Sequence, residues 1–225
     1  MKIDKNVIEI LKNFSKINPG IVIEEGNRIK TVSNSKTIIG ISNVNVVFPR
    51  QFAIYNLSRF IMTLSLFEEP ELIFEDKYVI IKNEDKSVNY TYTDISLFQN
   101  YPYPEYTLPS KDVTFNITNK NLEDVHDALN KLKFNEILIT GDGNNIFLQA
   151  ANLDKTSLDV YSIKIGETDK EFKAVFNSDN LKILAENYEV TLSKKGAAHF
   201  KSDKVEYYIV LETTSTFWFE RIILC

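Results

Sequence analysis

Apolar and polar residues alternate with the period of an α-helix near the start of the chain. The apolar positions of this stretch are Val7, Ile8, Leu11, Phe14 and Ile17. That spacing places them on one face of a helix, with Asp4 as the N-cap and Pro19-Gly20 as the stop. The pattern predicts a helix over residues 5–16, whose opposite face carries Lys5, Glu9, Lys12 and Lys16. A solvated face with an internal Lys5–Glu9 pair is the default interpretation of such a stripe.

A pattern of strand, amphipathic run and further strands occurs twice in the chain. The first copy covers residues 52–92, with a helix from Leu57 to about Phe67 capped by Asn56. The second copy covers residues 173–209, with an amphipathic run over 181–184 that predicts a second helix. Corresponding positions are separated by about half of the chain, which is typical of a duplicated domain rather than of a short-period solenoid.

The two halves therefore follow one plan. In the second half, a helix with the apolar stripe Leu122, Val125, Leu129 and Leu132 follows a predicted strand. Alternating apolar positions and turn residues predict short strands in both halves. The first half has them over residues 21–23, 29–32, 37–41, 52–55, 71–74, 78–82 and 88–92. The second has them over 113–117, 136–140, 146–150, 158–165, 189–192 and 205–209.

Prolines are densest over residues 95–109, which contain Tyr101-Pro102-Tyr103-Pro104 and Pro109. Proline does not fit the interior of a helix or of a central strand, so this segment predicts an extended linker. We therefore expect two domains, residues 1–108 (with the linker from about 95) and 109–225. Each is expected to be α+β, with two helices packed on antiparallel sheets.

Composition narrows the function classes. The chain has 225 residues, 44% hydrophobic and 25% charged, which are ordinary globular values. No apolar run approaches the length of a membrane span and no signal peptide opens the chain, so we expect a soluble protein that is not secreted. Cys225 is the only cysteine, which excludes an intrachain disulfide and a cysteine-based metal site.

Catalytic arrangements are not evident. Gly141-Asp142-Gly143 lacks the third glycine of a dinucleotide fingerprint and is typical of a hairpin turn. His126 lies between Asp124 and Asp127, but such spacing on a helix is more often a solvated face than an acid–base pair. We therefore predict no enzyme activity, no catalytic residue, no cofactor and no metal.

The distribution of cationic residues points to a ligand. The net charge is −5 and the isoelectric point about 5.2, which argues against nucleic acid unless the cations are gathered on one surface. Four predicted helices would place their polar sides on a common surface suited to sequence-independent contact with a DNA backbone. The cations on those sides are Lys5, Lys12, Lys16, Arg59, Lys120, Lys131 and Lys182.

Several segments together resemble the sliding clamp, or DNA polymerase processivity factor, of T-even-like bacteriophages. The resemblance covers nearly the whole chain. Its pieces are Leu11-Lys12-Asn13-Phe14, Ile17-Asn18, Gly20-Ile21, Ala53-Ile54-Tyr55-Asn56-Leu57, Leu64-Ser65-Leu66, Gly196-Ala197-Ala198, Phe200, Tyr207, Leu211-Glu212 and Ser215-Thr216.

The resemblance implies two DNA-clamp domains per subunit and a ring of three subunits, with helices lining the hole and sheets outside. It implies a protein that encircles duplex DNA, is loaded by an ATP-driven clamp loader and tethers the DNA polymerase in the host cytoplasm. Asp124 and Asp127 depart from this picture, because the family tends to place more positive charge on that helix. The third helix is therefore expected to contribute little to DNA contact.

The end of the chain is longer and more apolar than the resemblance implies. One hypothesis is that it folds against a neighbouring subunit or into a partner groove, and an ordinary last strand is the alternative. The anchors of such a tail would be Phe217, Trp218, Phe219 and Ile222. For the chain as a whole, a β-rich phage virion structural protein is the alternative to a clamp, and a hydrolase with an unrecognised site ranks third.

Overall fold

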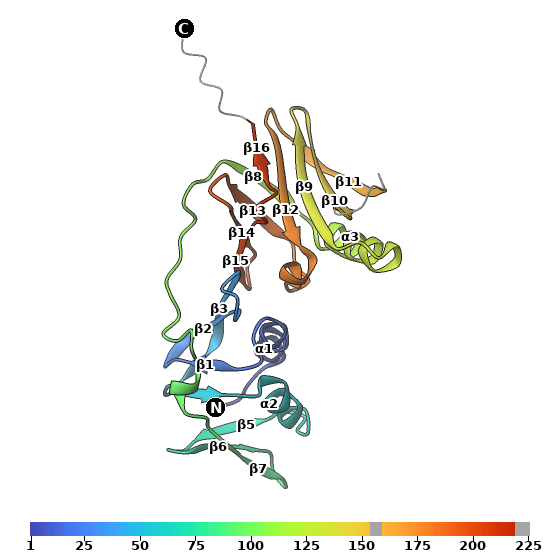
Figure 1. The fold of residues 1–225 in the computed structure, drawn as a ribbon. Coiled ribbons are helices and arrows are strands. Elements are labelled where there is room, and N and C mark those ends of the chain that lie inside the picture. The colour runs from blue at the N-terminus through green and yellow to red at the C-terminus, as the bar shows by residue number, and fades with distance from the viewer. Residues whose placement is uncertain (154–158, 219–225) are drawn as a thin grey trace. The chain divides into compact units, whose positions relative to one another are not determined.

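The protein forms two compact units. The structure is a computed structural model that describes residues 1–153 and 159–218 (Figure 1). The first unit comprises Met1–Glu105 and Lys204–Glu206, and the second comprises Tyr106–Asp203 and the described residues from Tyr207. The chain passes from one unit to the other inside the proline-rich segment. The domain boundary placed after residue 108 stays a prediction.

The first unit contains two α-helices and seven strands among its described residues. Strand β1 pairs with β4, β2 pairs with β3, and β5, β6 and β7 form a three-stranded sheet, all antiparallel. In chain order the elements are α1 (Lys5–Ile17), β1 (Ile21–Ile23), β2 (Gly26–Val32), β3 (Ile38–Phe48), β4 (Phe52–Ile54), α2 (Leu57–Leu64), β5 (Glu71–Phe74), β6 (Tyr78–Lys82) and β7 (Ser87–Thr91).

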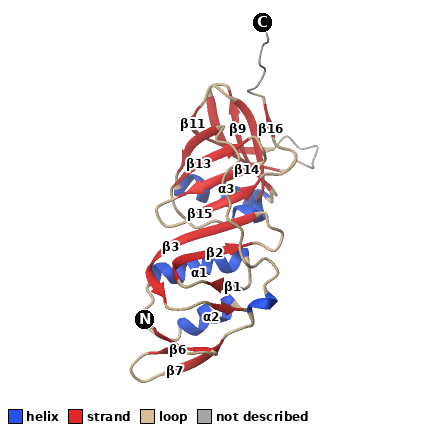
Figure 2. Cartoon of the chain, turned by 90° about the vertical axis from the view of Figure 1, so that its left-hand side faces the viewer, coloured by secondary structure: helices blue, strands red, loops and turns tan. Residues whose placement is uncertain are grey.

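Both helices of this unit begin where the sequence supplies a cap. The Asp4 carboxylate accepts from the Val7 N–H at 2.9 Å, and the Asn56 side chain accepts from the Arg59 N–H at 2.8 Å. The helices lie side by side on one face of the strands (Figures 1 and 2). Most apolar residues of the two helices are buried, with Phe14 and Leu57 at 0% exposure, while Ile8 and Ile17 of α1 are half-buried. The polar stripe of each helix is thereby left outward.

The second unit repeats this order with one α-helix and nine strands among its described residues. Its strands form a five-stranded sheet in the order β11-β10-β9-β12-β16, and β15, β14, β13 and β8 are neighbours in that order. The elements are β8 (Val113–Ile117), α3 (Asn119–Leu132), β9 (Glu136–Asp142), β10 (Asn145–Ala151), β11 (Val160–Glu167), β12 (Glu171–Asn177), a 3₁₀ turn η2 (Ser178–Leu181), β13 (Tyr188–Ser193), β14 (Ala197–Lys201), β15 (Glu206–Val210) and β16 (Thr216–Phe217).

The prediction of a second helix in this unit over residues 181–184 was wrong. The segment between β12 and β13 is residues 178–187, much shorter than residues 55–70 at the equivalent place in the first unit. It holds only the single turn η2, capped by Asn177. Two buried tyrosines hold the residues that follow η2. The Leu184 N–H donates to the Tyr207 hydroxyl at 3.2 Å, and the Tyr188 hydroxyl donates to the Leu184 carbonyl at 2.7 Å. These bonds hold the Leu184 backbone in place of helical bonds.

The linker is anchored to the first unit by side chains from far along the chain. Glu105 accepts a bidentate pair of bonds from Arg28, both at 3.0 Å, and a third from the buried Lys30 at 3.1 Å. Arg28 is the main cause of the lowered pKa of Glu105. The Val22 N–H donates to the Tyr103 hydroxyl at 3.2 Å. The linker is extended as expected, except for a short 3₁₀ turn η1 over Ile95–Leu97.

Candidate nucleic-acid interface

Helix α1 presents a stripe of cations. Lys5, Lys12 and Lys16 are all exposed on the face opposite the buried Phe14 and Leu11. Seven residues of α-helix span about 10 Å, so Lys5 and Lys12 are about that far apart along the axis on nearly the same face. Glu9 is the only acidic residue within the helix, which gives α1 a net charge of +2. All three lysines are therefore exposed on a cationic face, and that they face DNA stays a prediction.

Helix α2 adds one cation beside α1. Arg59 is exposed in the first turn of α2, while Leu57, Phe60 and Leu64 of the same helix are buried. Within the part of the chain that the structure describes, neither Arg59 nor the three lysines of α1 form an ion pair with a carboxylate. These four side chains are therefore available to an external anion.

The predicted cations of the second unit are differently placed. Each is held by an aspartate three or four residues away: Lys120 by Asp124 at 2.6 Å, Lys131 by Asp127 at 2.7 Å, and Lys182 by Asp179 at 2.6 Å. The aspartate partners raise the pKa of Lys120 and Lys131, so both lysines remain charged. Helix α3 carries two lysines against three carboxylates, and its net charge is −1.

His126 lies on the same helix and has a structural role. Burial is the main cause of its lowered pKa, which is partly offset by a hydrogen bond with the backbone of Leu181. That bond ties α3 to the turn η2. His199, the other histidine, stacks on Tyr208 with ring centroids 4.4 Å apart. Within residues 1–153 and 159–218, no group of three or more His, Cys, Asp or Glu side chains is placed to hold a metal ion.

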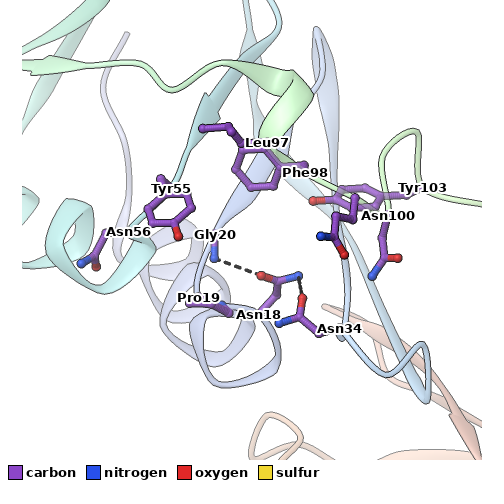
Figure 3. Close-up of a pocket in the computed structure, with 11 residues that line it drawn as sticks. Asn18, Pro19, Gly20, Asn34, Tyr55, Asn56, Leu97, Phe98, Asn100 and Tyr103 are labelled. Carbon is purple, nitrogen blue, oxygen red and sulfur yellow. Dashed lines mark hydrogen bonds between the residues drawn. The ribbon is translucent and has the colours of Figure 1, made fainter.

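A pocket of about 450 Å³ in the first unit was not foreseen from the sequence. It lies at the end of α1 and the start of the linker, and Figure 3 shows Asn18 on its wall between Gly20 and Asn34. Asn18 donates to the Val32 carbonyl at 2.8 Å and accepts from the Gly20 N–H at 3.1 Å. A Cβ on Gly20 would lie 2.8 Å from the Phe98 ring, so glycine permits the linker to approach this closely. The residues that line the pocket are neutral, which makes it unsuited to phosphate.

The apolar end of the chain is only partly described. Strand β16 pairs with β12, and the rings of Phe217 and Phe172 stack with centroids 6.1 Å apart. The Trp218 N–H donates to the Glu171 carbonyl at 3.0 Å, while its side chain is 57% exposed. The predicted anchors Phe219 and Ile222 lie outside the described residues. The role of this tail stays a hypothesis.

The fold of the chain, two α+β units with antiparallel sheets, is the fold of solved DNA polymerase clamps. The fold matches proliferating cell nuclear antigen of A. fulgidus, solved with the C-terminal region of FEN-1, at a TM-score of 0.71 and 14% identity, covering 96% of this chain and 98% of that one. It also matches the proliferating cell nuclear antigen of Entamoeba histolytica at a TM-score of 0.71 and 12% identity, covering 92% of this chain and 94% of that one. A third match is the DNA polymerase III β subunit of Pseudomonas aeruginosa (TM-score 0.66, 10% identity, 94% and 64% covered).

The sequence identifies the family more narrowly. The chain is 30% identical to the sliding clamp of Vibrio phage KVP40 over 220 residues, covering 94% of this chain and 99% of that protein. It is 29% identical to the sliding clamp of Enterobacteria phage T4, with 96% and 99% covered. A family model described as the C-terminal part of the gp45 sliding clamp matches residues 114–213. The chain belongs to the sliding clamp family of T4-like phages.

This finding confirms the resemblance seen in the sequence and the α+β clamp fold. It supports the DNA polymerase clamp and not the alternative of a virion structural protein. None of the helices described in either unit is both long and apolar enough to cross a membrane.

Proposed function

We propose that three copies of the chain close into a ring around duplex DNA and hold it by enclosure, without base-specific contacts. The observation that carries the proposal is the outward, unpaired cationic stripe on α1 and α2 of a clamp-fold chain. Lysines and an arginine at such positions neutralise phosphates and read no sequence. The proposed DNA-facing set is Lys5, Lys12, Lys16, Arg59, Lys120, Lys131 and Lys182. The first four have no carboxylate partner among the described residues, whereas the last three each contact an aspartate.

The acidic net charge is compatible with this function. A ring that encloses DNA stays on by topology, so it needs only weak and salt-sensitive contacts. Solvent-exposed charges more than about 10 Å apart are screened at roughly 0.1 M salt, so cations on a helix face act locally while acidic residues elsewhere do not cancel them. A net charge of −5 over the whole chain also discourages DNA from binding at other surfaces.

Edge strands supply the means of self-assembly. Among the described residues, β7 has a partner strand only on its β6 side and β11 only on its β10 side. Both have unpaired backbone groups on their outer sides, and β11 also exposes 51% of Val160. Unprotected edges of this kind pair with other chains. We propose that β7 of one chain pairs with β11 of the next, a head-to-tail contact that closes into a ring.

The partners follow from the family. We propose that the ring tethers the DNA polymerase and is opened by an ATP-driven clamp loader in the cytoplasm of the infected host. In this proposal the chain performs no chemistry of its own, needs no cofactor or metal and acts through position alone.

The mass of the assembly tests the ring. Light scattering coupled to size exclusion is expected to give a single species of three times the 26.0 kDa chain mass. Val160→Asp should shift that species towards monomer. Pairing of β11 with β7 of the next chain would bury this position, and burial of an unpaired carboxylate destabilises the contact. Val210→Asp changes another exposed valine, 43% exposed and outside β7 and β11, and should leave the mass unchanged. A monomer or an open polymer from the native chain would refute the ring.

A further inference from the structure

The two units differ in whether the predicted DNA-facing cations contact a carboxylate. The four cations on α1 and α2 have no carboxylate partner among the described residues, whereas Lys120, Lys131 and Lys182 each contact an aspartate at 2.6–2.7 Å. Each of these aspartates lies three or four residues from its lysine in the sequence, two of the pairs on α3 and one at the turn η2. The sequence spacing therefore keeps each partner close, whichever rotamers the exposed side chains adopt.

We propose that Asp124 and Asp127 restrain the lysines of α3. The first unit then makes the stronger contacts with the DNA phosphates, and α3 of the second unit presents a surface of nearly balanced charge to the DNA. The proposal rests on the proposed function. A phosphate that approaches Lys120 or Lys131 competes with an aspartate for the ammonium group and lies close to the negative charge of that aspartate. The local gain from counterion release is therefore smaller at α3 than at α1, where three lysines face one glutamate.

The consequence is a limit on how tightly the ring holds DNA. A sliding ring must exchange its phosphate contacts continually, and each additional firm contact adds to the barrier against movement. A ring in which the first unit of each chain binds phosphates more strongly than the second keeps the duplex near the cations of the first units without fixing it in place. Asp124 and Asp127 are then positioning residues that act through Lys120 and Lys131.

The test is the pair of substitutions Asp124→Asn and Asp127→Asn in the full chain. Both keep side-chain size and remove two negative charges per chain. Binding to a fluorescent linear duplex of random sequence is expected to become about three- to ten-fold tighter at ~50 mM salt, with a steeper salt dependence. Single-molecule diffusion of the loaded ring along DNA is expected to become slower.

Two further variants separate restraint from a change in overall charge. Glu84→Gln with Asp85→Asn removes the same charge from the exposed turn between β6 and β7, and should change affinity less than two-fold. Adding Lys120→Gln and Lys131→Gln to the aspartate variant should return the affinity to about the native value, because the gain depends on the released lysines.

The outcomes are distinct. If the aspartate variant and the turn variant tighten binding equally, or if neither does, the inference is wrong. If the native ring does not bind duplex DNA at all, or if Lys5→Glu with Lys12→Glu leaves binding unchanged, the proposed function fails instead. Thermal unfolding of every variant within a few degrees of the native protein shows that the fold is retained.

Discussion

Replacing Lys5 and Lys12 by glutamate should weaken the association of the protein with duplex DNA by about ten- to a hundred-fold at ~100 mM salt. Both side chains are exposed on α1 and lack a carboxylate partner in the described part of the chain, so reversal converts an attractive stripe into a repulsive one. The slope of log affinity against log salt should fall by about 0.9 for each phosphate that is no longer neutralised. Fluorescence anisotropy over a range of salt concentrations measures both quantities.

A matched control lies in the same unit. Lys77→Glu with Lys86→Glu makes the same change of charge on exposed residues of the turns that precede and follow β6. This variant should bind DNA nearly as the native protein does, because its charges do not belong to the cationic faces of α1 and α2. An equal decrease of affinity in the two variants would show that net charge, and not the α1 stripe, controls binding. A large decrease of thermal stability in the α1 variant would instead show that its lysines contribute to the fold.

The largest expected effect on stability comes from Tyr188→Ala. Tyr188 is 1% exposed, and its ring makes edge contacts with Phe200 at 6.0 Å and Tyr207 at 6.2 Å. Deleting a large buried aromatic side chain costs about 3–5 kcal/mol in the free energy of unfolding. The variant also lacks the bond that fixes the Leu184 carbonyl. At a fixed chain concentration, thermal unfolding should occur on the order of 10 °C lower.

Tyr188→Phe separates the hydroxyl from the ring. This variant keeps the aromatic packing and removes only the 2.7 Å bond to Leu184, which should cost about 0.5–1.5 kcal/mol. A phenylalanine variant as unstable as the alanine variant would mean that the hydrogen bond, rather than the buried ring, dominates at this site. Burial raises the pKa of Tyr188 well above its ordinary value, so the hydroxyl stays a donor throughout the neutral range.

The helices of this protein could be predicted where local signals agreed. Asp4, Asn56 and Thr118 each precede an amphipathic run and each caps its helix in the structure. Local chemistry is sufficient in these cases because the cap bond and the apolar stripe lie within a few residues. Most strands with a predicted range were placed within a few residues, although β3 extends to Phe48 where the predicted strand ends at residue 41.

The misplaced helix at residues 181–184 shows where local patterns fail. Leu181 and Leu184 have helical spacing, but both are buried beside tyrosines that come from β13 and β15. The hydrogen bonds of those hydroxyls join residues that are up to 23 positions apart, so no short window of sequence reveals them. The anchoring of Glu105 by Arg28 is a longer-range case of the same kind.

The sequence predicted which cationic residues lie in the candidate interface, but not which of them form ion pairs with aspartates. The sequence places Lys120 and Lys131 on the outer side of α3 and puts aspartates nearby. Which of these charges contact one another depends on side-chain geometry, and the structure shows both lysines paired. The pocket around Asn18 gave no sequence signal, because its amide-bearing residues come from the end of α1, the β2–β3 turn, the start of α2 and the linker.

Retention on DNA of different topology tests enclosure most directly. Rings loaded onto nicked circular duplex should stay bound through a wash at high salt, because topology rather than charge holds them. Cutting the same circles once with a restriction enzyme should release the rings within the time needed to diffuse to an end. Equal retention on circles and on cut DNA, or release from both at high salt, would contradict a protein that holds DNA by encircling it.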